Sequence, residues 1–255
     1  MVLARAGHRP YLEASTHVTA RYLIVNADDF GAGRLINRGI LECHQRGIVT
    51  SASLMVDRPG SEDAAERSQG ARGLSVGLHI CLTREAGVPR GDFADPEWCV
   101  AEVNRQFERF ETLMGRIPTH LDTHHNVQRD QRVLPHLAAL SVRHALPLRE
   151  HSSVRYFSEF YGQWDGNTHA EQISPDNLMR LLTTSVEQGI TELGCHPGYV
   201  DPEFPTSYAV EREMELRTLC DPAVRRFLWA ENIRLINFSD LKTVAGGQAP
   251  ARGTS

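Results

Sequence analysis

The stretch Tyr22-Leu23-Ile24-Val25-Asn26-Ala27-Asp28-Asp29 joins an apolar run directly to two adjacent carboxylates. Its apolar part, about Tyr22–Asn26, has the length of a buried β-strand. An amphipathic stretch near Leu35–Arg46 follows, with the spacing of a helix that stops at Gly47. A strand followed by a helix is the unit from which α/β proteins are built. The two acids are therefore expected at the edge of a sheet.

The same order of strand and helix repeats along the chain. Expected strands cover residues 22–26, 49–56, 74–82, 119–123, 146–149, 191–195 and 233–237, and expected helices cover 35–46, 61–69, 98–115, 134–144, 174–188, 209–219 and 222–231. Segments 84–96 and 151–169 are expected to be long loops. About seven strands that alternate with helices predict an α/β protein with a mostly parallel sheet. We interpret the chain as a single-domain, distorted TIM-like (β/α) barrel rather than an open doubly wound sheet.

Length and composition narrow the class of protein. The chain has 255 residues, of which 41% are hydrophobic and 23% charged, so it is long enough for one large domain and short for two. We expect a mobile tail over residues 1–19, the domain over 20–243 and a flexible tail over 244–255. A net charge of −5 argues against nucleic acid or an anionic membrane surface as a partner. No apolar run approaches 18 residues, which argues against a transmembrane helix.

The cysteines suggest a reducing compartment. There are five of them, scattered and without a Cys-x-x-Cys pair: Cys43, Cys81, Cys99, Cys195 and Cys220. An odd, unpaired set favours free thiols over a disulfide framework, so we expect a cytoplasmic protein. Apolar residues on the outer helices would permit a homodimer.

Acids and imidazoles recur where the hydrophobic runs stop. They come from four separate segments of the chain: Asp28, Asp29, His79, His120, Asp122, His124, His125 and His196. Each has a structural alternative. An acid after a strand can cap a helix, a histidine inside an apolar strand can be a satisfied core residue, and a turn histidine can bond to backbone. One shared site explains all four segments together, because barrel enzymes build their sites from the loops that follow the strands.

These residue types suit metal-assisted hydrolysis. One carboxylate and two imidazoles make a three-ligand site for a divalent ion that leaves positions open for water and substrate. Such an ion lowers the pKa of water and polarises a carbonyl. A free carboxylate such as Asp28 can take the proton of the water, and a histidine across the site, such as His196, can protonate a leaving amine. The pattern therefore indicates hydrolysis of an amide.

At these residues the sequence resembles the YdjC/ChbG family of carbohydrate deacetylases. The resemblance runs from about Tyr22 to Leu241, and its motifs stand in order at compatible spacing. The matching segments are Asn26-Ala27-Asp28-Asp29-Phe30-Gly31, Thr50-Ser51-Ala52-Ser53-Leu54-Met55, Gly77-Leu78-His79-Ile80-Cys81-Leu82-Thr83, Pro118-Thr119-His120-Leu121-Asp122-Thr123-His124 and Cys195-His196-Pro197-Gly198-Tyr199.

The resemblance implies a distorted barrel related to polysaccharide deacetylases, and a set of roles for its residues. Asp29, His79 and His124 would hold one divalent metal ion. Zinc is favoured, and the alternatives are magnesium or a transition metal such as manganese, cobalt or nickel. Asp28 would be the general base, and His196 would serve the leaving group or the substrate. The implied substrate is a small-molecule N-acetylated sugar, including chitin-derived oligosaccharides, from which acetate is released.

One departure from the family pattern affects the substrate. The family often continues with a second histidine two residues after the first, and here that position is Asn126. Asn126, Tyr199 and Trp164 are the candidate substrate contacts, and segments 84–98 and 151–169 are the candidate specificity loops. Two other functions stay open: a metal-dependent phosphoesterase or other amidohydrolase on a similar barrel, and an inactive sugar-binding relative.

Overall fold

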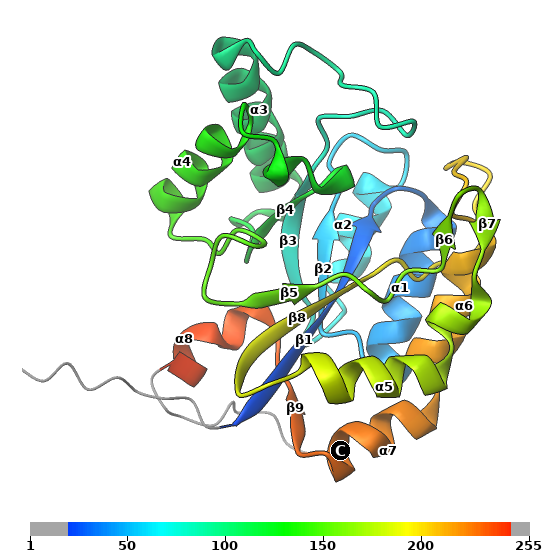
Figure 1. Cartoon of the computed structure of the whole chain (residues 1–255). Coiled ribbons are helices and arrows are strands. Elements are labelled where there is room, and N and C mark those ends of the chain that lie inside the picture. Colours follow the sequence, from blue (N-terminus) through cyan, green and yellow to red (C-terminus); the bar gives the residue numbers. More distant parts are fainter. Residues whose placement is uncertain (1–19, 246–255) are drawn as a thin grey trace, which may run out of the picture.

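A parallel sheet of seven strands forms the centre of the computed structural model, which describes residues 20–245 (Figure 1). Its strands are β1 (Arg21–Phe30), β2 (Ser51–Leu54), β3 (Ser75–Ile80), β4 (Leu121–Thr123), β5 (Arg155–Phe157), β8 (Gly189–Cys195) and β9 (Ile233–Leu235). Their order is β4-β3-β2-β1-β8-β5, with β9 beside β1, and every pairing is parallel. The expected α/β barrel class is confirmed.

Strand β1 is the axis of this sheet. It pairs with β8 along residues 21–27, while its other edge meets β9 at residues 21–23 and β2 from Asn26 onward. Leu23, Ile24 and Val25 are fully buried, as expected of a strand covered on both faces. The register with β2 shifts between Ala27 and Phe30, where the two acids lie. The ladder is therefore irregular at the point where the site begins.

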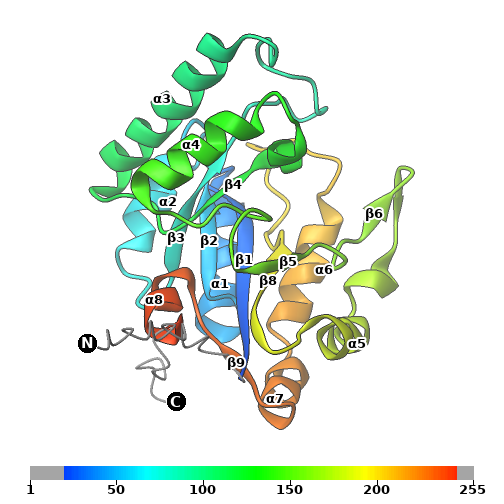
Figure 2. The same ribbon diagram turned by 60° about the vertical axis from the view of Figure 1, so that its left-hand side comes forward.

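Helices lie outside the sheet (Figures 1 and 2). They are α1 (Arg34–Arg46), α2 (Ser61–Ser68), α3 (Pro96–Met114), α4 (Leu134–His144), α5 (Pro175–Ser185), α6 (Val210–Leu219), α7 (Pro222–Ala230) and α8 (Leu241–Ala245), with short 3₁₀ turns η1 (His124–Arg129), η2 (Ala170–Ile173) and η3 (Phe238–Asp240). In α3, α5 and α7 a capping Asp or Ser precedes a first-turn proline, a combination that starts helices well. No helix within residues 20–245 has the length and apolar character needed to cross a membrane.

The structure differs from expectation on the side that closes the barrel. The predicted strand 146–149 is reduced to one bridge between Leu121 and Leu148, and β5 lies inside the segment expected to be a loop. A hairpin of β6 (Gln163–Trp164) and β7 (Asn167–Thr168) follows it. Strands of two or three residues, some of them exposed, are too short to leave a periodic pattern in the sequence. Helix α8 runs to Ala245, two residues past the predicted domain boundary, and both tails otherwise lie outside the described residues.

His120 belongs to the packing rather than to the strand-end cluster. Its ring stacks on Phe238, with ring centroids 3.7 Å apart, and it covers the backbone of Gly77 in β3. A Cβ atom at Gly77 would lie 2.4 Å from Cε1 of the His120 ring. Gly77 is thus required by close packing, not by an unusual backbone angle.

We predict that Gly77→Ala lowers the free energy of unfolding by about 1–3 kcal/mol, the usual cost of overpacking a core. Urea denaturation followed by circular dichroism measures the change. Gly70→Ala is the matched control, because a Cβ there meets only the Arg67 carbonyl oxygen at 3.7 Å. Equal stability of the two variants would show that the His120 ring gives way at no cost.

Candidate metal centre and active-site pocket

The irregular end of β1, with the turn that follows it, holds Asp28 and Asp29 in a fixed geometry. Asp29 has a φ of 65°, and Gly31 follows with a φ of 90°. The side chain of Asn37, from α1, accepts a hydrogen bond from the Gly31 amide at 2.7 Å and donates to the Gly60 carbonyl at 2.9 Å. Asn37 therefore fastens the turn to the segment before α2. Because the ladder between β1 and β2 is interrupted here, the neighbouring carboxylates of Asp28 and Asp29 contact different residues.

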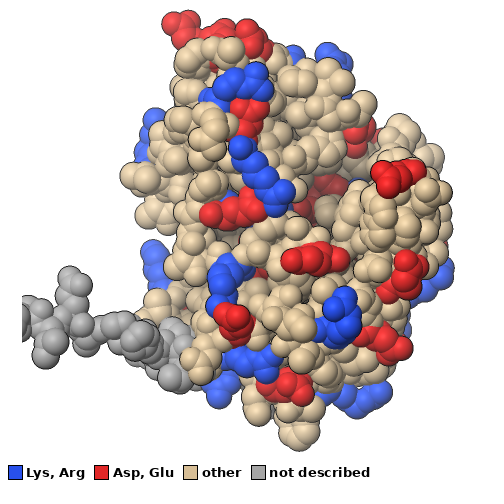
Figure 3. Space-filling model, in the orientation of Figure 1, with Lys and Arg blue, Asp and Glu red and all other residues tan. Residues whose placement is uncertain are grey.

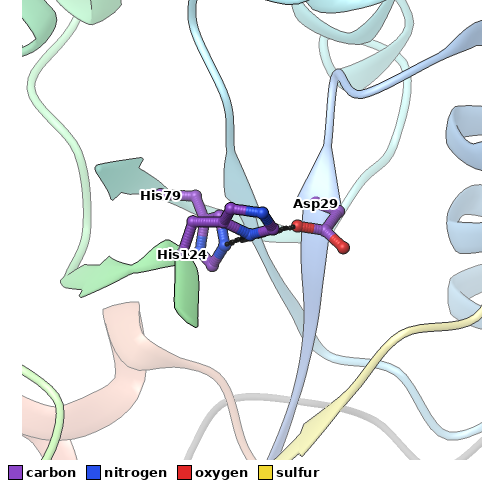
Figure 4. A group of neighbouring side chains, drawn as sticks. All are labelled: Asp29, His79 and His124. Carbon is purple, nitrogen blue, oxygen red and sulfur yellow. Dashed lines mark hydrogen bonds and ion pairs between the residues drawn. The ribbon is translucent and has the colours of Figure 1, made fainter. Parts of the chain in front are cut away.

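Asp29, His79 and His124 form a triangle of ligand atoms (Figure 4). Asp29 Oδ1 lies 3.3 Å from His79 Nε2 and 3.3 Å from His124 Nδ1, and the two nitrogens are 3.4 Å apart. The edge of a tetrahedron around zinc, with bonds of about 2.0–2.1 Å, is about 3.3–3.4 Å. Asp29 Oδ1 is buried and accepts no hydrogen bond. The three atoms thus match one face of a tetrahedral metal site.

A neighbouring carboxylate orients His79, and a guanidinium orients Asp29. His79 Nδ1 lies 2.7 Å from Asp122 Oδ1, which places the proton on Nδ1 and leaves Nε2 free toward the triangle, as in many metal sites. Asp29 Oδ2 accepts a hydrogen bond from Arg212. Burial alone would raise the pKa of Asp29, but Arg212 and the two histidines hold that pKa well below its usual range. The ligand carboxylate is therefore ionised.

Asp28 is clamped by Arg149. The guanidinium donates to both carboxylate oxygens, at 2.7 and 2.8 Å, and also contacts Asp122 at 2.9 Å and Glu192 at 2.6 Å. Burial opposes ionisation of Asp28, yet the charge and hydrogen bonds of Arg149 hold its pKa far below the usual range. Burial raises the pKa of Glu192 to about 7. One buried cation thus faces three carboxyl groups.

His196, at the end of β8, forms the opposite wall. Its Nε2 is 3.9 Å from Asp28 Oδ2, and its buried Nδ1 has no hydrogen-bond partner. Glu215, from α6, accepts a hydrogen bond from the His196 backbone amide and another from the Tyr208 hydroxyl. Desolvation lowers the pKa of His196 to about 4 and raises the pKa of Glu215 to about 8. Both groups are therefore mainly neutral at pH 7.

These side chains converge on one pocket of about 340 Å³. Of the predicted site residues, six line it: Asp28, Asp29, His79, His124, Asn126 and His196. His125 lines it too, and Asn126 and His125 both have positive φ angles. Positive and negative side chains are interspersed on the face of the molecule that Figure 3 shows. Residues from four separate segments of the sequence thus line one pocket.

Tyr199 and Trp164 are not brought to this pocket. The Tyr199 hydroxyl donates to Glu42 at 2.7 Å, beside α1, and the Trp164 ring stacks on His169 at 3.5 Å. No role was predicted from the sequence for several residues on which the pocket depends, although Tyr208, Arg212 and Glu215 lie in a late segment that also resembles the family: Glu85, Arg149, Glu192, Arg212, Tyr208 and Glu215. Glu192 did leave a signal, because it is a charge within the apolar stretch of β8. Arg212 and Glu215 lie on a helix whose pattern does not set them apart.

Comparison with solved structures supports the fold. A structure from Enterococcus faecalis, described as that of a candidate cellobiose-phosphate cleavage protein, superposes with a TM-score of 0.75 at 26% identity and covers 87% of this chain and 99% of its own. A peptidoglycan deacetylase from Bacillus subtilis shares the fold at a TM-score of 0.53 and 13% identity, covering 89% of this chain and 93% of its own. The chain therefore shares its barrel fold with both of these proteins.

Sequence comparison identifies the family. A carbohydrate deacetylase from Clostridium beijerinckii is 34% identical over 86% of this chain and 99% of its own length. A chitooligosaccharide deacetylase from Serratia marcescens is 33% identical over 87% of this chain and 99% of its own. The model of the YdjC-like protein family matches residues 22–230. Alignment over nearly the whole domain, together with the pocket that the shared motifs build, makes this chain a member of the YdjC-like family.

Proposed function

We propose that this protein is a metal-dependent N-deacetylase that hydrolyses the acetamide of an N-acetylated amino sugar or glycoconjugate to an amine and acetate. The observation that carries the proposal is the triangle of Asp29, His79 and His124 in a pocket that also contains Asp28 and His196. The names of the carbohydrate and chitooligosaccharide deacetylase relatives support the substrate class.

The donor set fits one divalent ion, for which we favour zinc. Asp29, His79 and His124 would hold it, and when bound it would supply Lewis-acid polarisation of the acetamide carbonyl. Two imidazole nitrogens and one carboxylate oxygen favour zinc over magnesium, which prefers oxygen ligands.

A two-metal phosphoesterase is disfavoured by charge. A second group of ligand-capable atoms, Asp28, His79 and Asp122, lies beside the first. The guanidinium of Arg149 already contacts both of these carboxylates, so it takes the place that a second cation would need. The arrangement supports one ion per chain.

Asp28 and His196 can move a proton from water to the leaving amine. Asp28 is ionised and accepts the proton of the attacking water. His196 is neutral at pH 7 and must gain a proton before it can donate one. With 3.9 Å between Asp28 Oδ2 and His196 Nε2, a small movement lets Asp28 pass that proton on. His196 then protonates the amine.

We also propose a cytoplasmic location. All five cysteines are free, and even the nearest thiol pair, Cys43 and Cys220, has 3.8 Å between its sulfur atoms. Free thiols are the usual state of cysteine in a reducing compartment. A homodimer stays an expectation from the sequence.

The direct test is acetate release by the zinc-loaded protein from N-acetylglucosamine and its oligomers. We expect turnover that is lost on chelation and restored by added zinc. If metal-loaded protein binds these sugars without releasing acetate, it is an inactive sugar-binding relative instead.

We predict that the purified, zinc-loaded protein holds one ion per chain by elemental mass spectrometry. Asp29→Asn should weaken zinc binding at least about 100-fold in a chelator competition, and Asp122→Asn about 10–100-fold, because Asp122 orients His79 and is not itself a proposed ligand. Asparagine tolerates the left-handed backbone, so the first change removes charge without adding strain.

Asp165→Asn is the matched control for Asp29→Asn. Asp165 has a φ of 53°, is exposed in the β6–β7 turn and does not line the pocket. Its variant should bind zinc as the wild type does. Two ions per chain, or unchanged affinity of Asp29→Asn, would contradict the proposed ligand set.

We predict that Asp28→Asn lowers kcat for acetate release about 10²–10⁴-fold while one zinc ion stays bound. His196→Gln should have an effect of similar size. If the two residues pass one proton, the double variant loses little more than either single variant. Fully multiplicative effects in steady-state kinetics would mean that the two side chains act independently.

We predict that Glu215 makes the protein less stable as pH rises. Its pKa is about 8 in the folded protein against 4.5 when unfolded, so the native state retains a proton that the unfolded chain releases. This contribution is absent below pH 4.5 and grows to a loss on the order of 4 kcal/mol at pH 8.

Denaturation of wild type and Glu215→Gln from pH 5 to pH 8 measures this change in the free energy of unfolding. The glutamine stays neutral and resembles the protonated carboxyl, so the variant should gain stability relative to the wild type as pH rises. A difference that does not change with pH would show that Glu215 is ionised in the native protein.

A further inference from the structure

An aromatic pair lies at the rim of the pocket. Tyr161, just before β6, stacks on Tyr208, from the loop before α6, with ring centroids 4.5 Å apart and an angle of 9° between the rings. Both residues line the pocket. Tyr208 is buried, whereas Tyr161 is 39% exposed. Tyr208 thus backs one face of Tyr161, and the remaining ring surface is open.

The pair is held rigidly. The Tyr208 hydroxyl donates to Glu215 and accepts a hydrogen bond from the Gly162 amide at 3.0 Å. The β6–β7 hairpin is tied to α6, because Gln163 and Thr168 both donate to Glu211. The Tyr208 ring and the backbone next to Tyr161 are therefore held in place without a ligand, which lowers the entropy lost when something binds to the pair.

Depth in the pocket separates this pair from the reacting groups. The proposed ligands form the floor, with exposures of 1% for Asp29, 2% for His79 and 7% for His124. The half-buried His196 ring lies between floor and rim, with its centroid 6.0 Å from that of Tyr161. When the acetamide of a sugar lies at the floor, the ring of that sugar lies near His196. A ligand group that contacts Tyr161 is then farther from the floor than this sugar ring.

We propose that Tyr161 is a stacking platform for a second sugar unit, adjacent to the one that is deacetylated. This rests on the proposed deacetylase function. The C–H-bearing face of a pyranose is apolar and packs on a flat aromatic ring, while its hydroxyl groups need polar partners. Ser158, Thr206 and Ser207 line the same pocket and offer hydroxyl groups to them.

Trp164 provides an internal comparison. It lies on the same hairpin and is 43% exposed, but its ring stacks on His169 with 5° between the planes, and it does not line the pocket. Substitution of Trp164 therefore removes an equally exposed aromatic ring without touching the platform.

The test measures binding by titration calorimetry in the zinc-loaded Asp28→Asn background, where turnover does not interfere. The probes are N-acetylglucosamine and its tetramer. Tyr161→Leu keeps apolar bulk against Tyr208 but removes the ring, and we expect it to weaken tetramer binding about tenfold while monosaccharide binding changes less than about twofold. Tyr161→Phe and Trp164→Ala should both bind the tetramer as the background protein does.

Several outcomes would overturn the platform: equal weakening for both probes, no weakening at all, no binding of the tetramer by the background protein, or the same loss in Trp164→Ala. Thermal unfolding of each variant separates loss of binding from loss of the fold. Failure of the deacetylase proposal gives a different result, since wild type would then release no acetate although the tetramer binds through Tyr161.

Discussion

The buried guanidinium of Arg149 is the interaction on which the site depends. Asp28, Asp122 and Glu192 are each less than 4% exposed, and an isolated carboxylate at such depth would take up a proton rather than stay ionised. Arg149 contacts all three. Arg149 contacts Asp122, which orients His79 so that its Nε2 atom faces the other two ligand atoms. Arg149 also contacts Asp28 and keeps this proposed base ionised. One cation thus connects metal binding with proton transfer.

The sequence could predict elements with a periodic hydrophobic pattern and charged residues that interrupt such a pattern. Strand β1, its acids and helix α1 are visible because apolar periodicity stops where charge begins, and the same holds for His79 and His196. Arg149 was not predictable as a site residue. The hydrophobic pattern of its segment predicts a strand, but in the structure the segment forms only a single bridge to β4. Arg212 and Glu215 reach the pocket only through the packing of α6. Tertiary contacts assign these roles, and no spacing in the sequence encodes them.

The incomplete closure of the barrel gives the pocket its shape. Between β4 and β5 the described sheet has only the bridge at Leu148, and both strands have just three residues. Because these strands are short, the chain soon leaves the sheet. His125 and Asn126 lie in η1, directly after β4, and Tyr161 lies in the segment after β5. A regular barrel would place side chains in closed layers at this point. The irregular side instead leaves room for a ligand that extends from floor to rim.

Three of the seven non-glycine residues with a positive φ in the described part of the chain lie in the two segments that present ligands. Asp29 itself has a left-handed φ, and His125 and Asn126, directly after His124, have φ angles of 58° and 52°. Each such residue costs on the order of 1 kcal/mol or more, although Asp and Asn tolerate this region best. Asn37 locks the first turn, and the Thr83 hydroxyl bonds to His125 in the second at 2.8 Å. The chain accepts this strain on both sides of the triangle. A rigid, preformed set of ligand atoms is its physical consequence, and an ion entering it would need little rearrangement of the protein.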